Sequence, residues 1–345
     1  MRFYCLAAVT AVFISLAGLA SAFEIEDRKV YTATPELAVL RVISTADLNV
    51  FDPILRAFQA ENPGLTIDYT VTGTSDLMQA IHVENAVFDL AISSAMDLQT
   101  KLANDGFAQD LKTPGVADLP SWANWRDQLV AFTQEPAVLV VSDAFFGPQE
   151  SPRNRDELIA LLRENPDRFQ GRIGTYDVRR SGFGYLMATQ DSRNSEAFWR
   201  LMEVMGRLDA QLYCCSGEMI RDVASGKLAL AYNVLGSYAA SQLTTTKGFR
   251  IIEMNDYVNV MLRTVLIPVN AENRPHALAM VEFLSGLKNR PDLVAASGLP
   301  AIDTSVFQAN TALRPIRFGP GLLVFLDQLK RQKFLQNWES SLFQE

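Results

Sequence analysis

Short apolar runs alternate along this sequence with segments whose apolar residues are spaced three and four positions apart. The run at 37–43, for example, is followed by Phe51, Ile54, Leu55 and Phe58, which share one helical face. Similar runs predict further strands at 65–71, 88–92, 137–141, 172–176, 228–232 and 265–268. An alternation of strands and helices is typical of α/β architecture, in which helices cover a largely parallel sheet.

The segments between these strands predict helices, and turn residues delimit them. The first predicted helix stops at Asn62-Pro63-Gly64, where the chain must turn. Further helices are expected at 74–81, 182–189, 195–208, 216–223 and 277–284, a turn at 233–237, and two helical stretches between 321 and 343. The sequence has no internal repeat and no low-complexity linker, so we expect two lobes to be joined by strands.

The first residues have the pattern of an export signal. Met1-Arg2 gives a positive start, an apolar stretch runs to about Leu19, and small residues follow up to Ala22. This pattern predicts a secretory signal peptide at 1–22, cleaved after Ala22 in the Sec pathway, and a periplasmic protein. The only early cysteine, Cys5, lies inside the apolar stretch, which argues against a lipid anchor.

Composition limits the partners that the remaining chain can have. Removing residues 1–22 leaves 323 of the 345 residues, enough for two ordinary domains. No later stretch approaches the roughly 20 apolar residues of a membrane span. The net charge of −8, without a cluster of Lys and Arg, argues against nucleic acid or an anionic membrane as partner.

Polar residues stand where predicted strands end or helices begin. They are Ser44, Thr45, Asp47, Thr74, Ser75, Asp76, Ser93, Ser94, Ser181 and Gly182. Ligands of open α/β sheets bind outside the carboxyl ends of the strands. Helix starts there offer free backbone N–H groups to an anion. The alternative is that each residue is an ordinary helix N-cap.

The segment Arg179-Arg180-Ser181-Gly182-Phe183-Gly184 is the sharpest local feature. Its glycines allow backbone to approach a ligand closely, and an arginine can grip a phosphate or carboxylate with two hydrogen bonds. The alternative is a solvated arginine pair before a capped helix. The segment lacks the Gly-Lys-Ser/Thr of a P-loop.

Cys214 and Cys215 are adjacent and leave two interpretations open. As a dithiol they would bind a thiophilic ion such as arsenite, whereas a vicinal disulfide or two half-buried small residues would not. Two thiols alone are too few for a structural zinc site. A helix start at Ser216 would place Cys215 and Ser216 at the edge of a cleft.

Catalytic patterns are absent, so we expect no enzyme, no cofactor and no metal. His82 and His276 are far apart, and no Gly-x-Ser-x-Gly motif occurs. Glu135 precedes Pro136 where the chain is expected to cross between lobes. It either lines the cleft or only precedes a constrained proline.

Several short motifs occur in an order that is more specific than any one of them. They lie at 42–45, 58–64, 88–94, 132–137, 231–238 and 314–323. In this order the chain resembles the bacterial periplasmic solute-binding proteins that include ferric-ion binders and the sugar-phosphate and phosphoglycerate-responsive proteins. The resemblance covers most of the chain after residue 22.

The resemblance implies a type 2 fold, with two Rossmann-like lobes joined by crossing strands. Lobe 1 would contain 23–137 plus about 264–300, and lobe 2 would contain 138–263 plus about 301–345. The cleft between them would close on a small organic anion, such as a sugar phosphate, a phosphoglycerate or a carboxylate. A monomer would then engage an ABC permease or the periplasmic domain of a sensor kinase.

The resemblance also bears on the ligand. Ferric-ion binders place adjacent tyrosines just after the strand that here is 228–232, and this sequence has Gly236-Ser237 there. We therefore expect no iron site. Asn233, Gly236 and Ser237 remain candidates for contact with an organic ligand.

Overall fold

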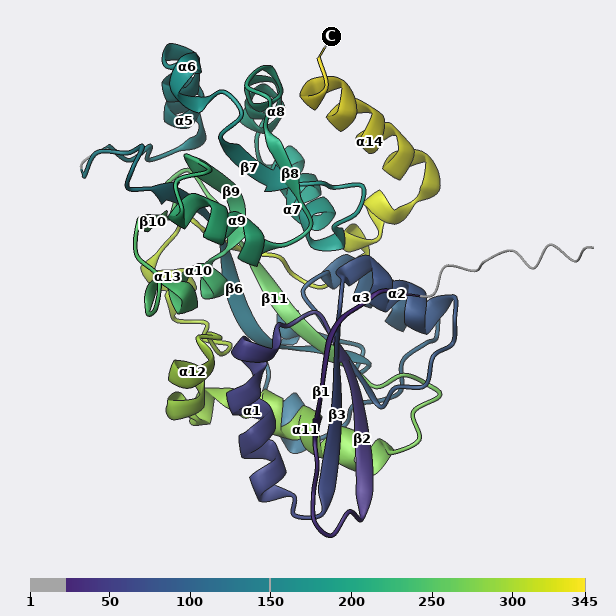
Figure 1. Cartoon of the computed structure of the whole chain (residues 1–345). Helices are drawn as coiled ribbons and strands as arrows, with labels where there is room; N and C mark the ends of the chain where they lie inside the picture. Colours follow the sequence, from purple (N-terminus) through teal and green to yellow (C-terminus); the bar gives the residue numbers. More distant parts are fainter. Residues whose placement is uncertain (1–22, 149, 345) are drawn as a thin grey trace, which may run out of the picture.

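The chain forms two lobes, each a β-sheet flanked by helices, in a computed structural model that describes residues 23–148 and 150–344. Two long strands run between the lobes (Figure 1). The predicted signal peptide with its cleavage site after Ala22 lies outside the described residues. The two-lobed α/β fold expected from the sequence is thus confirmed. Among the described residues, no helix is long and apolar enough to cross a bilayer.

Lobe 1 is built on a sheet in the order β1-β3-β2-β4, in which β2, β3 and β4 are parallel and β1 is antiparallel. Its strands are β1 (Ile25–Tyr31), β2 (Ala38–Ser44), β3 (Leu65–Thr72), β4 (Leu90–Ser93) and β5 (Asn124–Trp125). Its helical segments are α1 (Leu48–Glu61), α2 (Thr74–His82), α3 (Met96–Asn104), α4 (Pro114–Ala117), η1 (Ser121–Ala123), α11 (Arg274–Ser285), η2 (Leu287–Asn289) and α12 (Pro291–Ser297).

Lobe 2 continues the strand order with β9-β7-β8, all parallel to one another. Its strands are β7 (Ile173–Tyr176), β8 (Gln211–Tyr213), β9 (Leu230–Leu235) and β10 (Phe249–Ile252). Its helices are α5 (Arg155–Glu164), α6 (Pro166–Phe169), α7 (Gly182–Asn194), α8 (Ala197–Arg207), α9 (Ser216–Ala224), α10 (Gly236–Leu243) and α14 (Gln328–Leu342). Between α12 and α14 lie α13 (Val306–Ala309), β12 (Leu313–Pro315), η3 (Pro320–Leu322) and η4 (Val324–Leu326).

The crossing strands are β6 (Leu129–Ser142) and β11 (Val258–Leu266), which pair antiparallel from Val260↔Pro136 to Val265↔Val130. Beyond Pro136, β6 leaves β11 and pairs with β9 in lobe 2. A proline is tolerated there because the strand changes partner at that point. The lobes are therefore connected by continuous sheet rather than by a flexible linker.

The cores follow the predicted periodicity where that periodicity is strong. In α1 the buried face consists of Val50, Phe51, Ile54, Leu55 and Phe58. Phe51 stacks on Tyr69 of β3 with ring centroids 5.5 Å apart. Burying each large apolar side chain stabilises the fold by roughly 1.5–3 kcal/mol. This packing fixes the start of α1 at the carboxyl edge of the lobe 1 sheet.

Three sequence predictions are wrong in detail. The strand predicted at 265–268 is the end of β11, which begins at Val258, because Asn259 and Arg263 interrupt its apolar pattern. The predicted turn at 233–237 is instead the end of β9 followed directly by the start of α10. The tail holds one long α-helix, α14, preceded by two 3-10 turns rather than a second helix.

Candidate functional site

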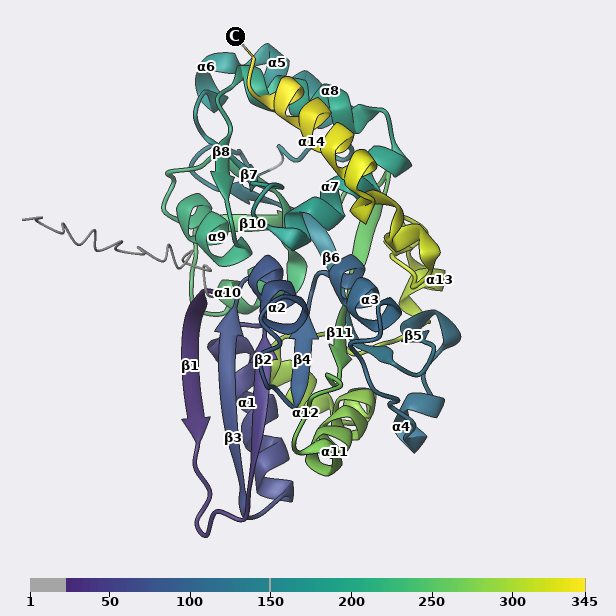
Figure 2. The same ribbon diagram turned by 90° about the vertical axis from the view of Figure 1, so that its right-hand side faces the viewer.

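Helix N-termini from both lobes face one another because the parallel strands of each sheet end toward the other lobe. The backbone N–H of Asp47 at the start of α1 donates to the Tyr238 hydroxyl in α10, at 3.0 Å. The Ser75 hydroxyl in α2 donates to the Arg180 carbonyl, at 2.9 Å. We call this contact zone the interlobe seam. Figure 2 shows α2 and α3 of lobe 1 directly below α7 of lobe 2, so the lobes are closed on each other.

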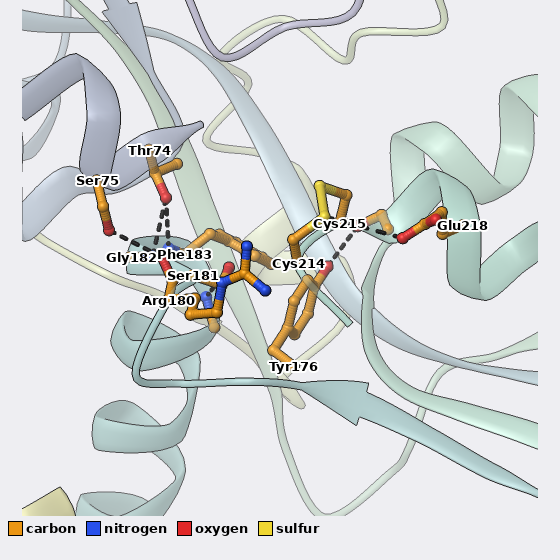
Figure 3. Close-up of a disulfide and its surroundings, with 12 residues drawn as sticks. Thr74, Ser75, Tyr176, Arg180, Ser181, Gly182, Phe183, Cys214, Cys215 and Glu218 are labelled. Atoms are coloured by element: carbon orange, nitrogen blue, oxygen red, sulfur yellow. Dashed lines mark hydrogen bonds between the residues drawn. A yellow bond between two sulfur atoms is a disulfide. The ribbon is translucent and has the colours of Figure 1, made fainter. Parts of the chain in front are cut away.

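The N-terminus of α7 is occupied by side chains. The N–H groups of Gly182 and Phe183 donate to Thr74 Oγ1, at 2.9 and 3.3 Å, and the N–H of Gly184 donates to Ser181 Oγ, at 3.1 Å (Figure 3). A Cβ at position 182 would lie 2.9 Å from Thr74 Oγ1, so a side chain there would crowd the native Thr74 and glycine allows the contact without displacing it. Two of the N–H groups that the sequence suggested for an anion are thus bonded across the seam, and the third is bonded to the N-cap Ser181 of the same helix.

The other helix N-termini at the seam differ from α7. The N-cap residues of α1, α2, α9 and α10 are Asp47, Gly73, Cys215 and Leu235, and none of these residues caps its helix with a side-chain hydrogen bond. Asp47 therefore does not serve as the N-cap hydrogen-bond acceptor that the alternative interpretation required. Uncapped N-termini carry partial positive charge and N–H donors, which favour an anion.

The crossing strands carry a buried ion pair at the seam. Arg263 of β11 donates to Glu135 of β6 through Nε, at 2.9 Å, and through Nη2, at 3.1 Å. The Thr133 hydroxyl donates to Glu135 at 2.8 Å, and the Ser237 hydroxyl makes a short bond to its other oxygen. Both charged side chains are fully buried. Burial opposes the charge of Arg263, but Glu135, Tyr238 and Tyr69 together act in the opposite direction, so the pKa of Arg263 is raised.

Glu135 lies where the lobes meet, fully buried in this ion pair, and its contact with a ligand stays a prediction. Sequence analysis missed Arg263. One nitrogen of Arg263, Nη1, is buried and has no hydrogen-bond partner among the described residues. The guanidinium lies 5.9 Å from the ring centre of Tyr238. A lone arginine within the apolar strand Val258–Leu266 is the sequence feature that would have revealed it.

Phenols and a carboxylate surround this arginine. The Tyr69 hydroxyl donates to the Ala46 carbonyl, at 2.8 Å, and burial raises the pKa of Tyr69 and Tyr238. Burial also raises the pKa of Asp47, while the positive charges of Arg263 and Arg221 act in the opposite direction. Asp47 therefore lies near two arginines, Arg263 of the crossing strand β11 and Arg221 of lobe 2.

The predicted arginine pair has two different environments. Arg179 donates twice to Asp177, at 2.8 Å each. The guanidinium of Arg180 forms no ion pair or hydrogen bond with any described residue, and neither does that of Arg221 in α9. Arg221 Nη1 lies 3.5 Å from the position that a Cβ at Gly217 would take, at the seam. Lobe 2 therefore presents two unpaired cations.

The rim of lobe 1 is acidic, because β1 runs antiparallel and starts at the carboxyl edge of the sheet. Asp76 accepts a hydrogen bond from the backbone of Glu24, at 3.2 Å. Burial raises the pKa of Glu26, and Asp47, Asp76 and Glu24 add to the effect. Carboxylates held this way accept hydrogen bonds from hydroxyl groups of a ligand.

The remaining polar residues of lobe 1 shape the turns at the strand ends. Ser44 and Ser93 each accept a hydrogen bond from the backbone N–H two residues later, at 3.0 and 3.1 Å. Thr45 Oγ1 accepts from the backbone N–H of Ser94, at 3.2 Å. These bonds bring the ends of β2 and β4 together beside the seam.

Cys214 and Cys215 are joined in a disulfide at the start of α9, beside the seam. Ser216 bonds to the Tyr176 hydroxyl and accepts from the Leu235 N–H, at 3.2 Å. Because the sulfurs are bonded to each other, no dithiol is available to a thiophilic ion. No observation supports the arsenite interpretation.

Asn233 belongs to a buried network in lobe 2 rather than to the seam contacts. Its amide donates to Asp191, at 2.7 Å, and so do the Tyr232 hydroxyl, at 2.8 Å, and the Asn259 amide, at 2.7 Å. Arg155 completes the network at 3.5 Å from Asp191. The network ties β9, α7 and α5 to the crossing strand β11.

The histidines lie outside the seam contacts. His82 packs on the Phe107 ring, with centroids 4.8 Å apart, and His276 bonds to Asn273, at 2.8 Å. Over the described ranges, no group of three or more His, Cys, Asp and Glu side chains is arranged to hold a metal ion.

Two lobes, crossing strands and polar strand ends that meet at a seam define a solute-binding protein of the two-lobed type. The family model of bacterial extracellular solute-binding proteins matches residues 44–290. The chain therefore belongs to this family. No match was found among curated proteins.

Solved structures agree with this assignment. The substrate-binding protein of an ABC transporter from Agrobacterium tumefaciens is 32% identical, with a TM-score of 0.87, over 92% of this chain and 98% of its own. AfuA from Actinobacillus pleuropneumoniae, with fructose-6-phosphate bound, is 13% identical, with a TM-score of 0.71, over 90% of this chain and 100% of its own. Iron-bound HitA from Pseudomonas aeruginosa is 14% identical, with a TM-score of 0.68, over 88% and 99%. The last two share the fold.

Proposed function

We propose that this protein binds a small organic anion between its lobes in the periplasm and delivers it, as a monomer, to an ABC permease. The uncapped N-termini of α1, α2, α9 and α10 at one seam carry the argument. Each offers N–H donors and partial positive charge to an anion. The unpaired guanidinium groups of Arg180 and Arg221 add full charges on the side of lobe 2.

The carboxylates at the rim of lobe 1 indicate which class of anion the protein binds. An inorganic anion has at most one or two hydroxyl groups to offer Asp47 and Glu26, and sulfate has none. A sugar phosphate or hydroxy acid has an anionic end for the arginines and hydroxyl groups for the carboxylates. Hydroxylated organic anions therefore fit this seam best.

Transport is favoured over sensing by one comparison. The Agrobacterium relative, which is 32% identical over almost its whole length, is the binding protein of an ABC transporter. In either role the ligand would stabilise the closed lobes by binding them more tightly than the open ones. No observation favours catalysis, and binding without turnover is the expected behaviour.

Calorimetry on ligand-stripped protein tests the proposal. We expect a sugar phosphate or hydroxy acid from a panel of fructose 6-phosphate, glucose 6-phosphate, 3-phosphoglycerate and citrate to bind, and fructose and inorganic phosphate to bind much more weakly. Absence of binding to every organic anion would refute the proposal. So would a coloured tyrosinate complex with ferric ion, because Tyr69, Tyr176 and Tyr238 are the phenols at the seam.

A further inference from the structure

The buried guanidinium of Arg263 is only partly satisfied by the protein. Nε and Nη2 are bonded to Glu135, whereas Nη1 has no partner among the described residues. The side chain has no exposed surface. A buried donor without a partner is costly, and more so when it belongs to a charged group. An acceptor supplied by another molecule would remove this cost.

Arg155 shows that this chain can satisfy a buried arginine completely. Its Nε donates to the Tyr232 hydroxyl, at 2.7 Å, and its Nη1 to Asp256, at 3.0 Å. Its Nη2 lies 3.5 Å from Asp191. Arg155 is 3% exposed, so burial alone does not explain the unpartnered nitrogen of Arg263.

The position of Arg263 links it to both lobes. It lies on β11, which crosses between the lobes, and faces Tyr238 of lobe 2. Its charge also opposes the rise that burial causes in the pKa of Asp47, at the start of α1 in lobe 1. A ligand oxygen at Nη1 would therefore lie at the bottom of the seam, where the two lobes and the crossing strands meet.

We propose that Arg263 Nη1 anchors the anionic group of the ligand and makes the seam selective for anions. This inference rests on the proposed function, and it names Arg263 as the residue that determines specificity for anions. The bond joins a charged donor to a carboxylate or phosphate oxygen, which is the stronger kind of hydrogen bond. Both N–H groups of Nη1 are available for it, and Glu135 holds the guanidinium plane in place.

The Asp47 carboxylate explains why Arg263 determines whether the site accepts a negatively charged ligand. With Arg263 in place, an incoming anion meets a cation next to the Asp47 carboxylate. Without the charge of Arg263, the bottom of the seam would present Asp47 and Glu135 and would repel an anion. Uncharged sugars, in contrast, would lose little when Nη1 is removed.

The Arg263→Lys variant tests the anchor. A lysine retains the charge that pairs with Glu135 but has no second nitrogen at the position of Nη1. We expect anions of the calorimetry panel, fructose 6-phosphate and 3-phosphoglycerate included, to bind about 10- to 100-fold more weakly, as for loss of a hydrogen bond between charged groups. Arg155→Lys is the matched control and should lower the melting temperature but not the affinity.

A second variant separates binding from folding. Arg263→Gln with Glu135→Gln removes both charges, so no buried charge is left unpaired. We expect this protein to fold and to bind neither fructose 6-phosphate nor 3-phosphoglycerate. If the native protein binds a panel anion and the folded Arg263→Lys protein binds it equally well, the anchor is wrong while the function stands. If the native protein binds none, the proposed function fails, and the anchor fails with it.

Discussion

At the scale of single residues, Asp97 is a carboxylate in an unfavourable place. It lies in the first turn of α3 and is 2% exposed, and Oδ1 has no hydrogen-bond partner among the described residues. Burial raises its pKa to about 7, although the N–H groups of Leu98 and Asp97 and the charge of Arg331 act in the opposite direction. The folded protein therefore holds a proton on Asp97 that the unfolded chain releases near its ordinary pKa of 3.8.

This difference predicts a pH-dependent stability. Between about pH 4 and pH 7 the folded state binds more protons than the unfolded state, so the free energy of unfolding falls as the pH rises, by about 1.4 kcal/mol per pH unit at most. Urea unfolding of Asp97→Asn should show a weaker fall over this range than the native protein. The exposed Asp292→Asn serves as control. Parallel curves for Asp97→Asn and native protein would contradict the assignment.

Single residues also show how far the sequence could predict the seam. Serine, threonine and aspartate at strand ends were recognisable because they break apolar runs. Thr74 and Asp47 do lie at the seam, but their partners Gly182 and Tyr238 depend on how the lobes close. Arg263 was missed because the predicted start of its strand lies seven residues after the observed start of β11. In addition, no local sequence pattern shows that a buried carboxylate on another strand faces this arginine.

At the scale of elements, α14 is held on lobe 2 by a close helix contact. Trp338 and Leu342 of α14 are buried, and the helix lies across lobe 2 beside α8 (Figure 2). Gly206 of α8 makes the approach possible. A Cβ there would lie 2.5 Å from the Leu342 carbonyl oxygen and 2.6 Å from that of Ser341.

Gly206→Ala should therefore push α14 away from α8. The atoms in the way belong to backbone and cannot move aside, so we expect a loss of stability of about 1–3 kcal/mol. Urea unfolding measures it. In the control Gly147→Ala, the nearest atom to the new Cβ is 4.0 Å away, and stability should hardly change. Equal stability of the two variants would mean that α14 packs less tightly than the structure shows.

Elements were predictable where their pattern is local. The helix face from Phe51 to Phe58 is confirmed in α1 because four apolar residues at helical spacing allow no other buried face. Strand β1 was missed because Ile25–Tyr31 is mostly charged and exposed. Helix α10 was missed because Gly236-Ser237 resembles a turn in sequence, whereas in the structure Gly236 begins a helix close against Pro136 and Val138.

At the scale of the whole molecule, polar contacts hold the lobes closed across the seam, and among the described residues no disulfide joins one lobe to the other. The Thr74 hydroxyl accepts hydrogen bonds from the backbone N–H groups of Gly182 and Phe183. The Ser75 hydroxyl donates to the backbone carbonyl of Arg180, and the backbone N–H of Asp47 donates to the Tyr238 hydroxyl. Such bonds contribute about 1 kcal/mol each, so opening costs little. We therefore expect the ligand-free protein to be more open on average in solution.

A cross-link between the lobes tests this closed geometry directly. In Thr74→Cys/Gly182→Cys, the new Cβ at 182 would lie 3.3 Å from the Cβ at 74, close to the spacing of about 3.5–4.5 Å that a disulfide requires. The nearest obstacle is the end of the flexible Leu98 side chain, which can turn aside.

Oxidation should trap the closed form, because the bond can form only while α2 and α7 are in contact. Small-angle scattering should give the oxidised variant a smaller radius of gyration than the ligand-free native protein, and mild reduction should restore the native value. The single variant Thr74→Cys controls for exchange with the Cys214–Cys215 disulfide. Cysteines that stay reduced under oxidising conditions would show that the lobes do not meet at these residues.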